Sequence, residues 1–180
     1  MALNADIFKV QVHISDMDRH YYQSHALTIA QHPSENDLRM MVRLMAFILN
    51  ATEELSFTKG LSSQDEPELW QKTLSDEIEL WIELGQIEEK RLRQACGKAQ
   101  KVIIYTYHDK QAEPWYAQMQ KSFARQKDLN VYHINSETCE ELAKLVTKNM
   151  DIQVSIQDGE VFISSDQGQV SFTPTLRYPV

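Results

Sequence analysis

Two glutamates, Glu68 and Glu83, are the residues whose spacing points most directly to chemistry. Glu83 lies in the otherwise apolar segment 80–85, and Glu68 follows Pro67 at the start of the preceding strand candidate. Two carboxylates on neighbouring strands form the oxygen-rich kind of site that Mg²⁺ prefers. Without a cation each carboxylate would raise the pKa of the other, so a metal or a basic neighbour must keep both ionised. The pair therefore predicts an acidic pocket that holds a cation.

The alternation of side chains in segment 80–84 bears on where Glu83 points. In a strand, Trp81 and Glu83 share one face, and the three aliphatic residues of the segment share the other. Glu83 then either faces a cleft beside a partner or faces solvent as an ordinary surface acid. The sequence leaves both orientations open.

Other residue types that carry chemistry form no pattern. The two cysteines, Cys96 and Cys139, make neither a disulfide framework nor a cysteine-based zinc site. The six histidines are scattered without a His-x-x-x-His pair, and the sequence contains no phosphate-binding loop and no Gly-x-Gly-x-x-Gly. We therefore expect no zinc centre and no nucleotide cofactor.

Charge is distributed unevenly along the chain. The 180 residues include 18 Lys and Arg and 26 Asp and Glu, which gives a net charge of −8. Residues 86–127 contain nine bases and four acids, whereas residues 65–89 contain nine acids and one base. The overall charge argues against a surface coated with Lys and Arg for non-specific binding to nucleic acid. The basic segment leaves a local basic groove open, and a solvated helix face explains it equally well.

Length and composition are those of one ordinary globular protein. A hydrophobic fraction of 42% and a charged fraction of 24% argue against disorder. The N-terminus lacks the basic start and apolar run of a signal peptide, and no stretch approaches about 18 consecutive apolar residues. We expect a single domain over residues 1–180 that is soluble, cytoplasmic and without membrane contact.

The first third of the chain predicts a β-hairpin followed by a helix. Apolar and polar residues alternate over residues 8–14, and residues 22–31 return as an antiparallel partner. Ser34 is a suitable N-cap for the next helix, in which apolar residues recur at helical spacing from Leu38 to Leu49.

The remaining elements alternate between strands and helices and end in a hairpin. Asp158-Gly159 is a strong two-residue turn signal between two strands, and Pro114 suits the first turn of a helix. We expect strands at 57–58, 68–72, 79–84, 102–107, 130–134, 152–157, 160–164 and 169–173, and helices at 88–99, from Pro114 onward and at 137–149. This order favours an α/β or α+β fold with a mixed sheet.

The segment around the two glutamates resembles a degenerate form of the nuclease motif PD-(D/E)XK. Pro67-Glu68 is followed, after fourteen residues, by Glu83-Leu84-Gly85. The whole chain resembles the YaeQ family of small bacterial proteins, on residues 2–9, 30–35, 39–41, 43–44, 57–61, 65–68, 80–85 and 156–159.

The resemblance implies a restriction-endonuclease-like core of helix, three-strand meander, helix and strand, extended by N- and C-terminal β-hairpins. It implies that Glu68 and Glu83 take the acidic positions of the motif. It further implies that Glu35, on the first helix, is an additional ligand of a Mg²⁺ cofactor. The position of the motif lysine is Gly85, which has no side chain.

A cation from the following helix would have to replace the missing lysine. Lys90 or Arg91 lies one turn into that helix, and an ordinary solvated helix face is the alternative interpretation of both. The first functional hypothesis is a Mg²⁺-dependent phosphodiesterase acting on nucleic acid, with Glu68, Glu83 and Lys90 as catalytic residues. The alternative is a non-catalytic module that associates with nucleic acid or with a protein.

Overall fold

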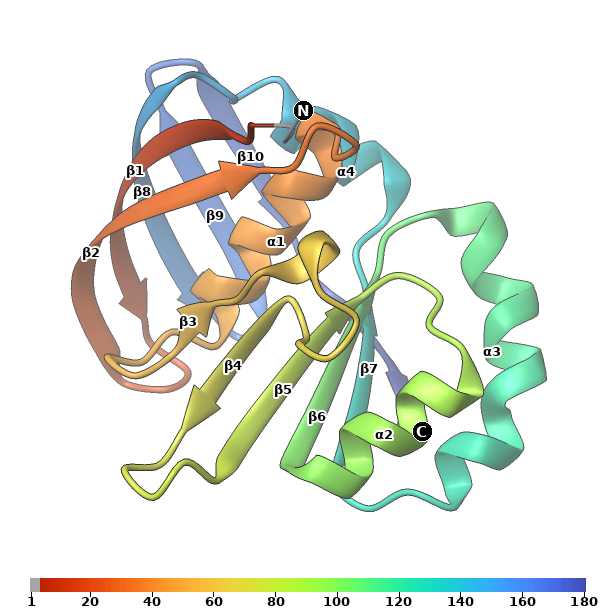
Figure 1. Ribbon diagram of the computed structural model, residues 1–180. Coiled ribbons are helices and arrows are strands. Elements are labelled where there is room, and N and C mark those ends of the chain that lie inside the picture. The colour runs from red at the N-terminus through yellow and green to blue at the C-terminus, as the bar shows by residue number, and fades with distance from the viewer. Residues whose placement is uncertain (1–3) are drawn as a thin grey trace. The chain divides into compact units, whose positions relative to one another are not determined.

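The computed structural model describes residues 4–180, whose contacts separate into two compact units. The first unit comprises the chain up to Met41 together with Glu137–Pro174, and the second comprises Val42–Ser136 together with Thr175–Val180. The long helix α1 (Asp37–Leu49) begins in the first unit and continues into the second (Figure 1). The prediction of one domain over residues 1–180 stays a prediction.

The first unit is built on a five-stranded mixed sheet. Its strands are β1 (Asp6–Asp16), β2 (Tyr21–Gln31), β8 (Asn149–Gln157), β9 (Glu160–Ser165) and β10 (Gly168–Phe172), in the spatial order β10-β9-β8-β1-β2. Strands β1 and β8 run parallel, and the other neighbours are antiparallel. The alternation predicted for residues 8–14 is confirmed, because every second side chain from Phe8 to Ile14 is buried.

Both predicted hairpins of this unit are confirmed. Strands β1 and β2 pair without a break from Asp6 with Gln31 to Asp16 with Tyr21. Asp158 and Gly159 connect β8 to β9 with φ angles of 52° and 79°, as a tight turn between twisted strands requires. Asp18, in the turn between β1 and β2, accepts hydrogen bonds from the backbone N–H groups of Asp158 and Gly159 at 2.8 Å. The β1–β2 turn is therefore hydrogen-bonded to the β8–β9 turn.

The second unit is built on a six-stranded mixed sheet. Its strands are β3 (Ser56–Phe57), β4 (Leu69–Lys72), β5 (Ile78–Leu84), β6 (Ala99–Thr106), β7 (Leu129–His133) and β11 (Thr175–Tyr178), in the spatial order β11-β7-β6-β5-β4-β3. Strands β5, β6 and β7 are parallel, whereas β3, β4 and β11 join the sheet in antiparallel fashion.

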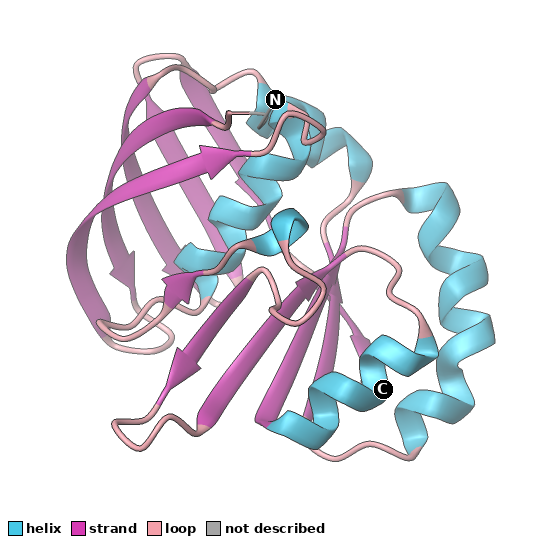
Figure 2. Ribbon diagram, in the orientation of Figure 1, coloured by secondary structure: helices cyan, strands magenta, loops and turns pink. Residues whose placement is uncertain are grey.

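Helices connect the parallel strands and cover one face of this sheet. Helix α2 (Glu89–Lys98) links β5 to β6, and α3 (Asp109–Ala124) links β6 to β7 (Figure 2). Leu92 of α2 and Trp115 of α3 belong to the same buried cluster as Trp81 and Ile104 of the sheet. The order α1, β3 to β5, α2 and β6 is the predicted order of helix, three strands, helix and strand.

Three sequence predictions of local structure are wrong. Asn36, not Ser34, caps α1: its side-chain oxygen accepts the N–H of Arg39 at 2.8 Å, while Ser34 bonds His32. Pro114 lies inside α3, which begins five residues earlier at Asp109. The helix predicted over 137–149 is the shorter α4 (Ser136–Ala143), because β8 already begins at Asn149.

The observed architecture is mixed α+β, with two mixed sheets and four α-helices among residues 4–180. Strand β11 was not predicted: it is four residues long and pairs with β7 irregularly between Leu176 and Tyr178. Over residues 4–180, we find no helix with the length and apolarity that a membrane crossing demands.

Candidate functional site

Glu83 is a buried carboxylate at the carboxyl end of β5. Only 5% of the residue is exposed, so the solvent-facing orientation left open by the sequence is wrong. Trp81, two residues earlier on the same face of the strand, donates its indole N–H to Oε1 of Glu83 at 2.8 Å. A buried carboxylate requires donors of this kind, because its charge has lost the solvation of water.

Arg91 of α2 is the cation that neutralises Glu83. Its Nε and Nη2 lie 2.9 and 2.8 Å from Oε1 of Glu83. Its Nη2 also donates to the carbonyl oxygen of Glu66 at 2.6 Å, and its Nη1 donates to that of Gln64. Arg91 therefore joins three parts of the second unit: helix α2, strand β5 and the loop before β4.

The surroundings of Glu83 raise the pKa of its carboxyl group above the ordinary value. Burial raises the pKa of the carboxyl group, and this effect exceeds the lowering by the Arg91 charge and by the hydrogen bonds from Trp81 and Arg91. The nearby charge of Glu68 raises the pKa of Glu83 further. Glu83 is thus a carboxylate whose ionised form depends on positive charge beside it.

Glu68 lies at the same end of the β4–β5 pair as Glu83. Leu69 pairs with Ile82, Glu68 immediately precedes Leu69, and Glu83 immediately follows Ile82. The N–H of Glu68 donates to the carbonyl oxygen of Ile82 at 3.0 Å, and the residue is 7% exposed. The two predicted acids are therefore neighbours at the same end of two adjacent strands, Glu68 just before β4 and Glu83 on β5.

Gly60 makes room for the Glu68 carboxylate. It opens the short 3₁₀ helix η1 (Gly60–Ser62), with a left-handed φ of 49°. A Cβ atom at this position would lie 2.8 Å from Oε2 of Glu68. The hydroxyl of Thr58 accepts the N–H of Gly60 at 3.0 Å and donates to the carbonyl oxygen of Pro67, which ties this segment to the start of β4.

Glu66 adds a third acid that the sequence analysis did not select. Its Oε2 is buried and forms no hydrogen bond with any group of residues 4–180. Its backbone carbonyl is one of the acceptors of Arg91. Within the described chain, however, no three His, Cys, Asp or Glu side chains are arranged as a group that could hold a metal ion. The observed core of the site is a pair of acids with one arginine.

The other two predicted site residues are Lys90 of the second unit and Glu35 of the first. Lys90 is exposed on α2, and it is its neighbour Arg91 that contacts Glu83. Glu35 belongs to the first unit, where its Oε2 lies 2.7 Å from Nη1 of Arg39. The expected position of Glu35 on the first helix is wrong, because α1 begins at Asp37 and Glu35 lies in the segment before it.

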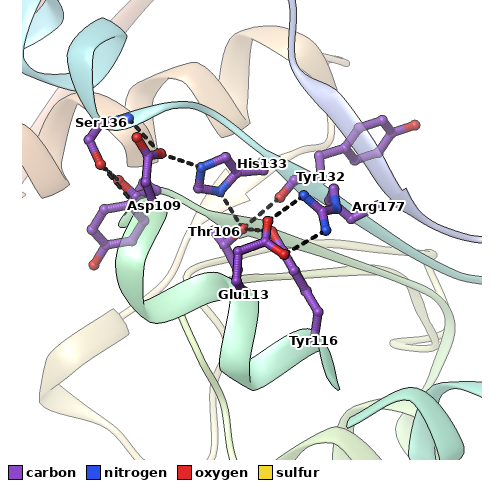
Figure 3. A network of polar contacts seen from close by, with 9 residues as sticks. Thr106, Asp109, Glu113, Tyr116, Tyr132, His133, Ser136 and Arg177 are labelled. Atoms are coloured by element: carbon purple, nitrogen blue, oxygen red, sulfur yellow. Dashed lines mark hydrogen bonds and ion pairs between the residues drawn. The ribbon is translucent and has the colours of Figure 1, made fainter. Parts of the chain in front are cut away.

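A second polar network lies at the carboxyl ends of β6 and β7. The His133 ring lies between two partners: its Nε2 is 2.7 Å from Oδ1 of Asp109, and its Nδ1 is 2.8 Å from the hydroxyl of Thr106 (Figure 3). Thr106 also bonds the phenol of Tyr116, and it is fully buried. The Thr106 hydroxyl is inaccessible, and both ring nitrogens of His133 already have partners. We therefore interpret the network as structural, and not as a catalytic nucleophile with its general base.

The same network ties the starts of two helices to the last strand. Asp109 and Ser136, at the starts of α3 and α4, each accept the other's backbone N–H at 3.0 Å. Arg177 of β11 bonds both carboxylate oxygens of Glu113 and lies over the ring of Tyr116 (Figure 3). No local spacing signals these contacts, since their partners are 27 and 64 residues apart.

Substituting Gly60 tests the packing of the Glu68 carboxylate. Gly60→Ala should lower the free energy of unfolding by about 1–2 kcal/mol, because alanine strains a left-handed backbone and displaces the carboxylate. Gly97→Ala, in α2 with open space around it, should instead raise the free energy by up to about 1 kcal/mol. Urea denaturation of both variants gives the comparison. Equal effects of the two substitutions would contradict the described packing.

Asp109→Asn tests the network of His133. Hydrogen bonds from His133 and Ser136 hold the pKa of Asp109 below its ordinary value, so its ionised form stabilises the fold. This contribution is present above about pH 3.9 and is lost as the pH falls through the lowered pKa. Asp109→Asn should therefore be less stable than wild type at pH 7, with a difference that shrinks in acid. The matched control is Asp166→Asn, the same chemical change in the exposed turn after β9, and its stability at pH 7 should equal that of wild type in urea denaturation.

Comparisons with known proteins give one consistent result. The family model described as YaeQ protein matches residues 1–174. Two curated proteins named "Uncharacterized protein YaeQ", from Salmonella typhi and Escherichia coli (strain K12), are 39% and 38% identical over 175 residues, and each match covers 97% of both chains.

Solved structures agree with this result. The crystal structure of the YaeQ protein from Xanthomonas axonopodis pv. citri is 42% identical with a TM-score of 0.94, over 96% of this chain and 98% of that one. The structure of the YaeQ protein from Pseudomonas syringae is 32% identical with a TM-score of 0.93, over 98% and 97%. By sequence and by fold along nearly its whole length, this chain belongs to the YaeQ family of bacterial proteins.

Proposed function

We propose that this protein is a metal-dependent phosphodiesterase that acts on nucleic acid, with a variant of the PD-(D/E)XK site. The observation that carries the proposal is the pair Glu68 and Glu83, buried at one end of neighbouring strands with the guanidinium of Arg91 against Glu83. Buried acids of this kind are costly to keep for stability alone, and they concentrate at functional sites.

Two carboxylates suit a divalent cation such as Mg²⁺, which proteins commonly hold through one or two carboxylates while water and substrate oxygens complete its coordination. Carboxylate oxygens are its preferred protein ligands, and Glu68 and Glu83 supply them from adjacent strand ends. The side-chain Oε2 of Glu66 is buried without a hydrogen-bond donor among residues 4–180, and the backbone carbonyl of the same residue accepts from Arg91. A bound Mg²⁺ would supply Lewis-acid activation of a phosphoryl oxygen and of the attacking water.

Arg91 takes the part of the missing motif lysine in this proposal. Gly85 has no side chain at the motif position, whereas Arg91 reaches Glu83 from the next helix. Its charge and its hydrogen bonds lower the pKa of Glu83 and so oppose the larger raising effect of burial, and the hydrogen bonds also orient that carboxylate. Lys90 points to solvent and is the weaker candidate for the same role.

The excess of bases in residues 86–127, nine against four acids, supports a polyanionic substrate. Eight of the nine bases in residues 86–127 are exposed, and only Arg91 is not. Exposed Lys and Arg attract phosphates at long range and release counterions on binding. The exposed bases are Lys90, Arg93, Lys98, Lys101, Lys110, Lys121, Arg125 and Lys127.

A specific observation also favours a second function, namely binding of nucleic acid without hydrolysis. The Nε, Nη1 and Nη2 atoms of Arg91 all have acceptors within the protein: Glu83 and the carbonyls of Gln64 and Glu66. An arginine so engaged has little capacity left for a phosphate, and it could neutralise Glu83 permanently. In that case the acid pair is a remnant of a nuclease site.

Metal titration and cleavage assays distinguish the two functions. Mn²⁺ binding is measured by calorimetry, and cleavage is measured on labelled single- and double-stranded DNA and RNA with Mg²⁺. The first function predicts that Glu68→Gln and Glu83→Gln each weaken Mn²⁺ binding by about tenfold or more and reduce cleavage by at least about 100-fold. Arg91→Ala should reduce cleavage more strongly than Lys90→Ala.

The matched control is Glu77→Gln, the same chemical change at an exposed acid in the turn before β5, and it should leave both properties unchanged. Wild-type protein that neither binds Mn²⁺ nor cuts any substrate would overturn the enzymatic function. Salt-sensitive binding to nucleic acid that is unaffected by Glu83→Gln would then support the second function.

A further inference from the structure

The outer face of the five-stranded sheet carries two exposed aromatic rings on one line across the strands. Tyr22 of β2 pairs with Ser15 of β1, and Ser15 pairs with Ser155 of β8. Ser155 pairs with Phe162 of β9, and Phe162 pairs with Ser171 of β10. Tyr22 is 55% exposed and Phe162 is 46% exposed. We call these five residues the aromatic row.

A second row of polar side chains runs beside the aromatic row, two residues away along each strand. Its members are paired in the same way across β2, β1, β8, β9 and β10. The two glutamines of this row, Gln153 and Gln169, flank Ser164, and each carries both donors and an acceptor. This amide row consists of Ser24, His13, Gln153, Ser164 and Gln169.

The two rows themselves carry no acidic or basic side chain, exposed acids Asp151 and Glu160 flank them on the same face, and a hollow lies over their β8–β10 part. Neither row contains Asp, Glu, Lys or Arg, although these types make up 24% of the chain. His13 is held between Ser24 and Asp151, at 2.8 and 3.1 Å. A shallow hollow of about 670 Å³ is lined by Phe162, Gln153 and Gln169 with the serines around them.

These features match the chemistry of a neutral sugar chain. One side of a sugar ring presents C–H groups that pack on the electron-rich face of an aromatic ring, and its hydroxyls need donors and acceptors at the edges. Tyr22 and Phe162 are three strand spacings apart, about 14 Å, which exceeds the length of one sugar ring. The spacing therefore suits an oligosaccharide rather than a monosaccharide.

The same features disfavour two other ligands that an open sheet face could bind, a nucleic-acid strand and a second protein. A nucleic-acid strand needs Lys or Arg beside the stacking rings to neutralise its phosphates, and the rows have none. A second protein needs a continuous apolar centre, and here the rings of Tyr22 and Phe162 are separated by two serines.

We propose that the outer face of the five-stranded sheet is a binding platform for a neutral oligosaccharide. Tyr22 and Phe162 stack against its sugar rings, and Gln153 and Gln169 hydrogen-bond its hydroxyl groups. This platform lies wholly in the first unit and does not depend on the phosphodiesterase proposed for the second.

The full chain labelled with ¹⁵N is titrated separately with cellohexaose, maltohexaose and N-acetylchitohexaose, and its amide resonances are followed by NMR. At least one oligosaccharide should shift resonances of β8, β9 and β10.

Phe162→Ala and Tyr22→Ala should each raise the Kd for that oligosaccharide by about tenfold, the effect expected for loss of one stacked ring. Phe162→Tyr, which keeps the ring, should bind like wild type, as should Leu74→Ala at a fully exposed site of the other unit.

Three results would overturn the platform. The first is that none of the three oligosaccharides shifts these resonances. The second is that a ten-nucleotide oligo(dT) shifts the same resonances more strongly and in a manner that depends on Phe162. The third is that Phe162→Ala dissociates a dimer of the free protein, because the face would then be an interface between two copies.

Discussion

The burial of one carboxylate, that of Glu83, constrains the structure around it. An ionised group at the apolar end of β5 must be given donors and a countercharge, or it takes up a proton. Trp81 and Arg91 provide both, and Arg91 in turn fixes the start of α2 and the loop at Gln64 and Glu66. The need of the buried Glu83 carboxylate for donors and a countercharge thus connects β5, helix α2 and the loop before β4 in the second unit.

The elements of the fold were largely predictable because their signals are local. Alternating side chains in β1, the Asp158-Gly159 turn and the helical spacing after Leu38 each act over a few residues, and each prediction is confirmed. The errors occurred where a local rule has competitors. Pro114 favours a helix start locally, but α3 already begins at Asp109 and continues through it, and Asn36 competes with Ser34 as a cap.

The candidate site was only half predictable. The sequence selects Glu68 and Glu83, because acids in apolar strands stand out, and the pairing of β4 with β5 brings them together. It does not distinguish Arg91 from Lys90, since one position on a helix decides which side chain faces the sheet. The partners of Arg91 in the loop before β4, and the His133 network, depend on contacts between distant segments that no spacing reveals.

The central claim is that Glu83 is a buried carboxylate whose ionisation depends on Arg91. The most direct measurement is the pKa of the Glu83 side chain, from an NMR titration of its carboxyl carbon in wild type and in Arg91→Met. The account predicts a pKa above the ordinary glutamate value of about 4.3 in wild type, and a still higher pKa in Arg91→Met, because burial then acts unopposed by that charge. A wild-type pKa at or below the ordinary value, or no change on removing Arg91, would contradict it.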